Sequence, residues 1–134
     1  MAGIKRDSSD KWFSDCIRHR AGYMCEHCGK GFTGLEQGFE NCHIWGRANK
    51  STRWCVDNCV AMCSGCHRTF TEHPMAFHAW LVEYLGQGHL DLLAEKKRQI
   101  FKTTHAVRME IAAHYRAEFR RMVDMNTTDL ISYQ

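Results

Sequence analysis

Proline and long apolar runs are scarce in this sequence. Pro74 is the only proline among 134 residues, which excludes a collagen-like or proline-rich extended chain. No run of 18 or more apolar residues occurs, so the sequence predicts no transmembrane helix and no membrane partner. Residues 1–13 also lack the apolar core that a secretory signal needs. A cytoplasmic location is therefore expected.

The composition is that of a globular protein, and the charge is unevenly distributed. Hydrophobic residues make up 44% and charged residues 25% of the chain, and the length predicts a single domain, residues 1–134, with a modest core. The net charge is only +3. Residues 95–121, however, hold eight lysines and arginines against three glutamates. A basic helical face suits a phosphate backbone, and a solvated helix face is the competing interpretation.

Apolar spacing predicts an α+β fold that is mainly helical. Trp12, Phe13 and Cys16 recur at helical spacing and indicate an N-terminal helix within residues 9–24. Short apolar runs indicate two strands, and later apolar stripes indicate more helices in a C-terminal part, 73–123. The expected strands are 39–44 and 59–63, and the expected helices after them are 64–70, 74–86, 89–99 and 104–123. Residues 126–134 are expected to be frayed.

Eight cysteines are the strongest chemical feature of the sequence. In a cytoplasmic protein they favour metal binding over disulfide bonds. Cys25 and Cys28 form one Cys-x-x-Cys pair, and Cys63 and Cys66 form another. Each pair places two thiolates on one tight turn, and soft thiolates prefer zinc to magnesium or calcium. The spacing predicts one closed, structural Zn²⁺ site, with His27 pointing to solvent.

Two histidines and an asparagine stand at matched positions around this zinc frame. The motif reads CEHC, then CHI, then DNCVAMCSGCH. His43 ends the first expected strand, Asn58 precedes the second, and His67 follows the last zinc thiolate. This stretch resembles the HNH endonuclease family, which implies a zinc-clamped ββα-metal core at residues 25–72. The chain is also similar to the phage NinG/Rap recombination nucleases over residues 10–122.

The resemblance and the chemistry of phosphodiester hydrolysis together assign roles to these residues. His43 has an ordinary pKa near neutrality and can take a proton from the attacking water as a general base. His67 can hold one catalytic divalent cation, Mg²⁺, Mn²⁺, Ni²⁺ or Zn²⁺, at the scissile phosphate. Asn58, by resemblance, holds the loop that orients His43.

One position departs from the family pattern. Many HNH enzymes place an aspartate metal ligand directly before the catalytic histidine, and Cys42 stands there in this chain. Three interpretations remain open: Cys42 binds a softer metal, Cys42 only packs while water and His67 hold the cation, or Glu40 supplies the oxygen from the same strand face. His73 is a further candidate ligand.

The remaining cysteines are expected to be structural. Cys16, Cys55 and Cys59 are interpreted as small buried hydrophobic residues. The alternative is a second metal site that joins Cys55 and Cys59 to Cys42.

Positive side chains near the motif and on the last helix predict contacts with DNA phosphates. The predicted DNA-binding residues are Arg47, Lys50, Arg53, Arg68, Arg116, Arg120 and Arg121. One candidate function is a divalent-metal-dependent DNA endonuclease, with branched or junction DNA in phage recombination and a homodimer as options. In that case the cytoplasm is that of the host cell. The other candidate is a zinc-stabilised DNA-binding or adaptor module without catalysis.

Overall fold

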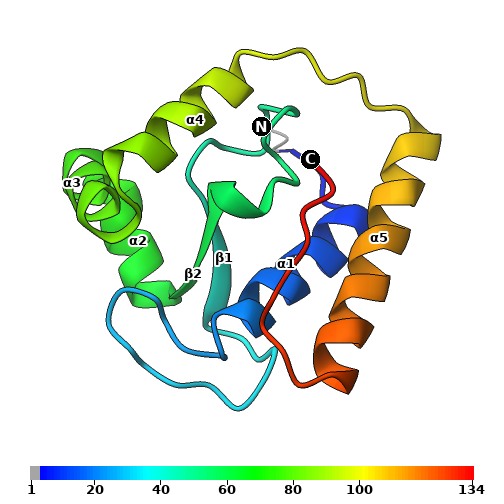
Figure 1. Cartoon of the computed structure of the whole chain (residues 1–134). Helices are drawn as coiled ribbons and strands as arrows, with labels where there is room; N and C mark the ends of the chain where they lie inside the picture. The colour runs from blue at the N-terminus through cyan, green and yellow to red at the C-terminus, as the bar shows by residue number, and fades with distance from the viewer. Residues whose placement is uncertain (1–3) are drawn as a thin grey trace.

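The computed structural model describes residues 4–134 and has the expected α+β architecture (Figure 1). Its elements are α1 (Ser8–Arg20), β1 (Phe39–His43), the 3-10 helix η1 (Val56–Asn58), β2 (Cys59–Cys63), α2 (Ser64–Glu72), α3 (Pro74–Leu85), α4 (Gln87–Lys97) and α5 (His105–Asp124). Each predicted strand and helix is present within a few residues of its expected bounds. Among the helices of residues 4–134, none is both long and apolar enough to cross a bilayer.

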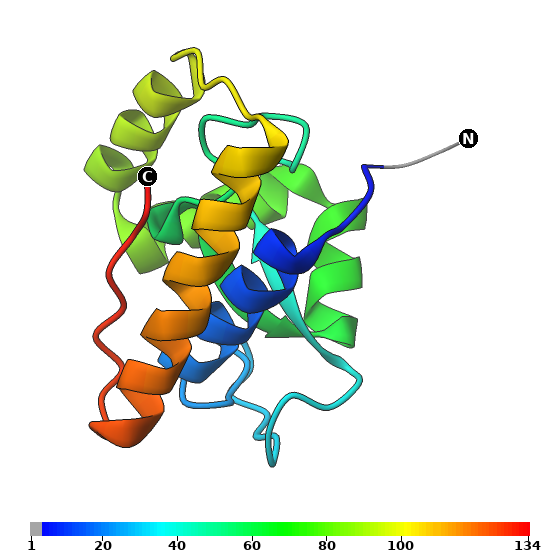
Figure 2. The same cartoon turned by 90° about the vertical axis from the view of Figure 1, so that its right-hand side faces the viewer.

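The two strands lie between two groups of helices. β1 and β2 pair in antiparallel fashion, with Phe39 opposite Cys63 and His43 opposite Cys59. α1 packs against both strands and along α5, whereas α2 contacts both strands and leads into α3 and α4. The two views show α1 and α5 together on one side of the strand pair and α2, α3 and α4 on the other (Figures 1 and 2). The motif residues on the strands and on α2 are thus held between two helical layers.

The larger core fills the space between α1, α5 and the sheet. Its fully buried side chains include Phe13 and Ile17 of α1, Phe39 of β1, and Ile111 and Tyr115 of α5. Complete burial of one such side chain contributes about 1.5–3 kcal/mol. This core fixes the position of α1 beside β1, and therefore the position of the polar residues that α1 presents beside the strand.

Polar caps define where α1 and α5 begin. The Asp7 carboxylate accepts a hydrogen bond from the Ser9 N–H at 3.0 Å, and the Asp10 carboxylate accepts one from the Asp7 N–H at 3.0 Å. This reciprocal pair is a capping box. Thr104 caps α5 by accepting a hydrogen bond from the Val107 N–H at 3.2 Å. Each cap contributes about 1 kcal/mol.

Residues 126–134 are packed, so the prediction of a frayed segment is wrong. Figure 2 shows this segment running back beside α5, and Leu130 and Tyr133 pack against the larger core. Its polar groups bond to the loop between β1 and η1 and to η1 itself. The Trp54 N–H donates to Gln134 Oε1 at 2.9 Å, and the Val56 N–H donates to Ser132 Oγ at 3.2 Å. These partners are far away in sequence, so no local pattern reveals them.

Candidate active site and metal centre

Four cysteines form a cluster with the geometry of a zinc site. The sulfur atoms of Cys25, Cys28, Cys63 and Cys66 all lie within 4.8 Å of one another. The sulfurs of Cys28 and Cys63 are 3.8 Å apart. Two ligands of a tetrahedral zinc with bonds of about 2.3 Å would be separated by roughly that distance. The predicted cluster is therefore confirmed as a site that can hold a structural metal ion such as zinc.

Backbone N–H groups at the two turns favour the thiolate form of the cluster. The N–H of Cys28 lies 3.4 Å from Cys25 Sγ, and the N–H of Cys66 lies 3.4 Å from Cys63 Sγ. Burial raises the pKa of Cys25, but the backbone hydrogen bonds outweigh it and lower that pKa to about 7. Burial and the neighbouring sulfurs raise the pKa of Cys66. A dication would offset this crowding of negative charge.

His27 is exposed, as predicted, and it also contacts the cluster. Its Nδ1 lies 3.2 Å from Cys66 Sγ. Its ring packs edge-on against Phe70 at 4.7 Å and against Trp80 at 5.3 Å between centroids. A hydrogen bond to a ligating sulfur orients the ligand and tunes its charge. The position of His27 inside a Cys-x-x-Cys turn was the available sequence signal for this role.

His43 is held as a neutral imidazole in a defined tautomer. Its Nε2 lies 3.1 Å from the carbonyl oxygen of Arg53. Because a carbonyl only accepts, Nε2 carries the proton and Nδ1 keeps the lone pair of the neutral ring. Burial is the largest cause that lowers the pKa of His43 to about 4, and the nearby charge of Arg47 acts in the same direction, against the opposing effect of the Arg53 carbonyl. The ring is therefore uncharged at neutral pH.

Asn58 is fully buried and fastens the loop that carries the Arg53 carbonyl. Its Oδ1 accepts from the Trp45 N–H at 2.9 Å, and its Nδ2 donates to the carbonyls of Trp45 at 2.9 Å and Thr52 at 3.1 Å. All the hydrogen bonds of the side chain join the two ends of one loop. Asn58 thus holds the loop beside His43, and its role in catalysis stays a prediction.

His67 pairs with Glu40, whereas Cys42 faces the core. His67 Nδ1 and Glu40 Oε1 are 2.9 Å apart. A contact of this length is an ordinary hydrogen bond between the imidazole and the carboxylate, and both groups are of the types that bind divalent cations. Cys42 is 3% exposed and packs among buried residues that include Val60. Burial and then the charge of Glu40 raise the pKa of Cys42 to about 12, so it remains a thiol.

Within residues 4–134, the four cysteines are the only group of three or more potential ligands close enough to share one ion. The structure therefore does not bring Cys42 or His73 to the Glu40–His67 pair. His73 ends α2, and its Nδ1 lies 2.9 Å from the Thr69 carbonyl. The alternative of a second metal site at Cys42, Cys55 and Cys59 is wrong for the same reason. Cys16, Cys55 and Cys59 are all buried, as expected.

His43, His67 and Glu40 line one open cleft of about 420 Å³. Three arginines from different parts of the chain line it as well: Arg6, Arg18 and Arg47. Arg18 donates to the Phe39 carbonyl at 3.2 Å and pairs with Asp15 at 2.6 Å, and Arg6 donates to Ser14 Oγ at 3.3 Å. Sequence reasoning missed Arg6 and Arg18, because only the packing of α1 beside β1 brings them to this cleft.

Arg53 is not available to DNA, and this part of the sequence prediction is wrong. Its guanidinium is buried and forms two hydrogen bonds with the Asp10 carboxylate, at 2.9 and 2.7 Å. A further bond joins it to the Lys5 carbonyl at 3.1 Å. Arg53 therefore holds the N-terminal segment to the loop, while its own carbonyl orients His43.

The predicted basic face of α5 is only partly free. Arg121 pairs with Glu118 at 2.8 Å and donates to the Asp129 carbonyl. Arg116 lies over the ring of Trp12, with its guanidinium carbon 5.8 Å from the ring centroid, and Arg120 is exposed. Arg68 is exposed on α2 and lines a shallow hollow beside His67. Lys50 is exposed in the loop between β1 and η1.

Comparisons with known proteins identify no relative. No protein-family model, no curated protein sequence and no solved structure matches this chain. The features of the chain that bear on function are therefore the zinc-type cluster, the neutral His43, the Glu40–His67 pair and the basic cleft that these last three residues share.

Proposed function

We propose that this chain is a divalent-metal-dependent DNA endonuclease of the HNH type, which hydrolyses phosphodiester bonds. The observation that carries the proposal is the state of His43. Its Nε2–H is used by the Arg53 carbonyl, its low pKa keeps it neutral, and it lines an open basic cleft. A histidine in this state can accept a proton at Nδ1 from a reacting water.

The groups around the cleft match the needs of phosphodiester hydrolysis. As the water oxygen bonds to phosphorus, His43 Nδ1 takes the proton, and the bond from phosphorus to the leaving oxygen breaks. A divalent cation, when bound, supplies charge neutralisation at the phosphate and at the leaving oxygen. Glu40 and His67 would hold that cation, and water and substrate oxygens would complete its coordination. Arg6 and Arg47 lie in the same cleft and favour binding of the phosphate charge.

The competing proposal is a zinc-stabilised DNA-binding or adaptor module. It is favoured by one observation, that Glu40 and His67 provide only two protein ligands for a catalytic cation. Such a module needs the four cysteines and a basic surface. It gives no reason for a neutral histidine with a fixed tautomer beside an acid–histidine pair.

A cleavage assay separates the two proposals. Supercoiled plasmid would be incubated with zinc-loaded protein and Mg²⁺, Mn²⁺ or Ni²⁺ in turn. We expect nicking by the wild type and a loss of about 100-fold or more in His43→Ala, the scale for removal of a general base. His78→Ala is the matched control, because His78 is exposed on α3. Absence of cleavage by the wild type with every metal would favour the adaptor module, and full cleavage by His43→Ala would refute the assigned base.

The cation ligands can be tested by rescue. His67→Ala should also lose cleavage, but through weaker binding of the cation, so a large excess of Mn²⁺ should restore part of the rate. The same excess should not restore His43→Ala, because no proton acceptor is returned. Equal rescue of both variants would contradict this division of roles.

The substrate of the proposed enzyme is branched DNA formed in phage recombination. This step of the proposal rests on the resemblance to the phage NinG/Rap recombination nucleases. Cleavage rates on a four-way junction, a flap and a plain duplex of equal length would test it. Equal rates on all three substrates would indicate an endonuclease without a preference for branched DNA.

A further inference from the structure

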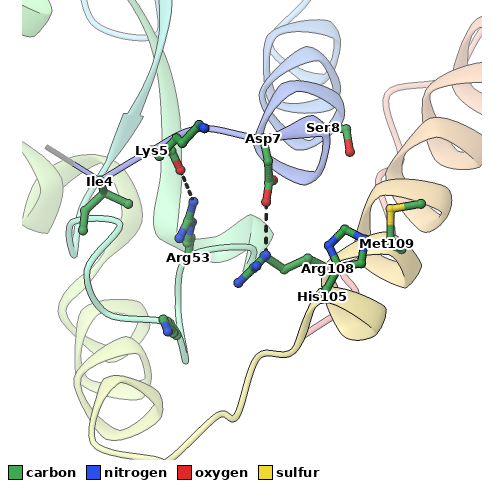
Figure 3. A pocket seen from close by; sticks show the side chains of 9 residues that line it. Ile4, Lys5, Asp7, Ser8, Arg53, His105, Arg108 and Met109 are labelled. Atoms are coloured by element: carbon green, nitrogen blue, oxygen red, sulfur yellow. Dashed lines mark hydrogen bonds and ion pairs between the residues drawn. The ribbon is translucent and has the colours of Figure 1, made fainter. Parts of the chain in front are cut away.

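A second basic pocket is lined by residues that the candidate active-site cleft does not use, and Figure 3 shows it from close by. It has a volume of about 490 Å³. Three segments that are far apart in sequence form it: the residues before α1, the loop between β1 and η1, and the first turn of α5. The polar and charged residues that matter for its chemistry are Lys5, Asp7, Lys50, Arg53, His105 and Arg108.

The charged side chains that line this pocket add up to a net positive charge. Arg53 is neutralised by Asp10 beneath the pocket, with the closest pair of atoms 2.7 Å apart. Arg108 pairs with Asp7 at 3.2 Å, as the dashed line in Figure 3 shows. Lys5 and Lys50 are exposed. Among the described residues that line the pocket, Asp7 alone carries a carboxylate. Two lysine charges thus remain for a bound anion.

Two helices also begin at this pocket. Asp7 is the cap residue of α1, and His105 is the first residue of α5. Figure 3 shows Asp7 and Ser8 from the start of α1 facing His105 and Arg108 from the start of α5. The partial positive charge of each helix start adds to that of the lysines. An anion in the pocket would therefore be favoured by lysines and by helix dipoles together.

The pocket and the cleft are built on the same two segments. In the segment before α1, Lys5 lines the pocket and Arg6 lines the cleft. In the loop between β1 and η1, Lys50 lines the pocket and Arg47 lines the cleft. Each of the two segments thus places one positive side chain in the pocket and one in the cleft, so both hollows can attract negative charge.

We propose that this pocket binds a backbone phosphate of the same DNA strand whose scissile phosphate occupies the His43 cleft. The inference rests on the proposed function and extends it to the substrate class. The ligand is a polynucleotide long enough to reach both hollows, rather than a single nucleotide. Lys5 and Lys50 bind this phosphate, and Arg53 holds the floor of the pocket in place.

The salt dependence of DNA binding tests the proposal. A fluorescein-labelled 20-base-pair duplex would be titrated with zinc-loaded protein, without added divalent cation, at several salt concentrations. Lys5→Gln/Lys50→Gln should reduce the slope of log affinity against log salt by about 1 for each lysine that contacts phosphate. Lys30→Gln/Lys96→Gln is the control, because it removes the same charge outside the pocket and the cleft. It should leave the slope nearly unchanged.

A second arm separates DNA phosphate from free phosphate. Inorganic phosphate would be titrated against the protein, and the NMR signals of Lys5 and His105 would be followed. We expect only weak, millimolar shifts from inorganic phosphate and a clear reduction of the DNA salt slope in the lysine variant. Tight binding of inorganic phosphate with an unchanged DNA slope would overturn the proposal in favour of a free-anion site. Equal slopes for the lysine variant and its control would overturn it as well.

The failure of this inference differs from the failure of the proposed function. If the wild type cleaves plasmid DNA while the lysine variant keeps the wild-type slope, only the phosphate pocket is refuted. If the wild type binds no duplex and cleaves no plasmid, the endonuclease and the pocket are refuted together.

Discussion

The four-cysteine cluster and the His43 cleft both take residues from the strand pair and from α2, yet they are built in opposite ways. The cluster is closed, since four protein sulfurs within 4.8 Å of one another leave no position for a substrate. The cleft is open, and its Glu40–His67 pair offers only two side chains that could bind a cation. A closed site stabilises the fold, whereas an open one leaves positions for water and substrate.

The two sites also differ in what holds them. The cysteines come from two tight turns, and a metal ion would join them directly. The cleft depends on hydrogen bonds from remote residues, because the Arg53 carbonyl that orients His43 belongs to a loop fastened by Asp10, Asn58 and residues 126–134. We infer that loss of a bound metal ion would disrupt the whole cysteine cluster. Loss of a single hydrogen bond would only weaken the support of the His43 cleft.

The largest expected effect is loss of the cluster. Cys66→Ser should lose zinc and unfold or precipitate, because structural zinc sites contribute about 10 kcal/mol or more to folding. Metal analysis and circular dichroism would measure this. Cys16→Ala is the control, since Cys16 is buried on α1 and outside the cluster, and it should keep one zinc per chain. A folded, zinc-free Cys66→Ser protein would show that the cluster is not needed for the fold.

The next effect concerns the buried Arg53–Asp10 pair, which holds the loop whose carbonyl contacts His43. Arg53→Ala leaves the Asp10 carboxylate buried without its partner, so we expect a loss of about 3–5 kcal/mol in the free energy of unfolding. Denaturant titration would measure it, with zinc content unchanged. Arg120→Ala, on the exposed face of α5, should change stability little. Similar losses in both variants would mean that the Arg53–Asp10 pair does not support the loop.

The pH dependence of stability tests the state of His43. Its pKa is about 4 in the folded protein against an ordinary value of 6.5. As the pH falls, His43 is therefore protonated in the unfolded chain before it is protonated in the folded protein. Its contribution to the free energy of unfolding is complete above pH 6.5 and is lost as the pH falls towards 4. By pH 5 the loss should be on the order of 2 kcal/mol relative to His43→Gln, which has no titrating ring. Parallel stability curves for the two proteins between pH 7 and 5 would show that His43 is not buried as described.

The smallest expected effect concerns residues 126–134. Gln134→Ala removes the acceptor of the Trp54 N–H and the donor to the Lys50 carbonyl, so stability should fall by about 1 kcal/mol. If these bonds also steady the loop beside His43, the cleavage rate should fall while the KM for DNA changes little. Thr128→Ala is the control in the same segment. An unchanged rate would limit the segment to a packing role.

Local patterns along the chain were enough to predict the helices, the strands and the four-cysteine cluster. Apolar spacing fixed the two strands and five helices, because a period of 3.6 or 2 residues is a local property of the chain. The two Cys-x-x-Cys pairs likewise identified all four cysteines of the cluster, because each pair acts within one turn. The proposed roles of His43, Asn58 and His67 were inferred from a motif, which is likewise a pattern in the sequence alone.

Which side chains share the cleft, and which form contacts elsewhere, depends on how distant segments pack. Arg53 donates hydrogen bonds to Asp10, 43 residues away in the sequence. Arg6 and Arg18 line the cleft because α1 packs beside β1. Cys42 turns into the core while Glu40, two residues earlier, meets His67. Such pairings depend on how distant segments pack and on which buried charges must find partners, and no spacing within one segment encodes either.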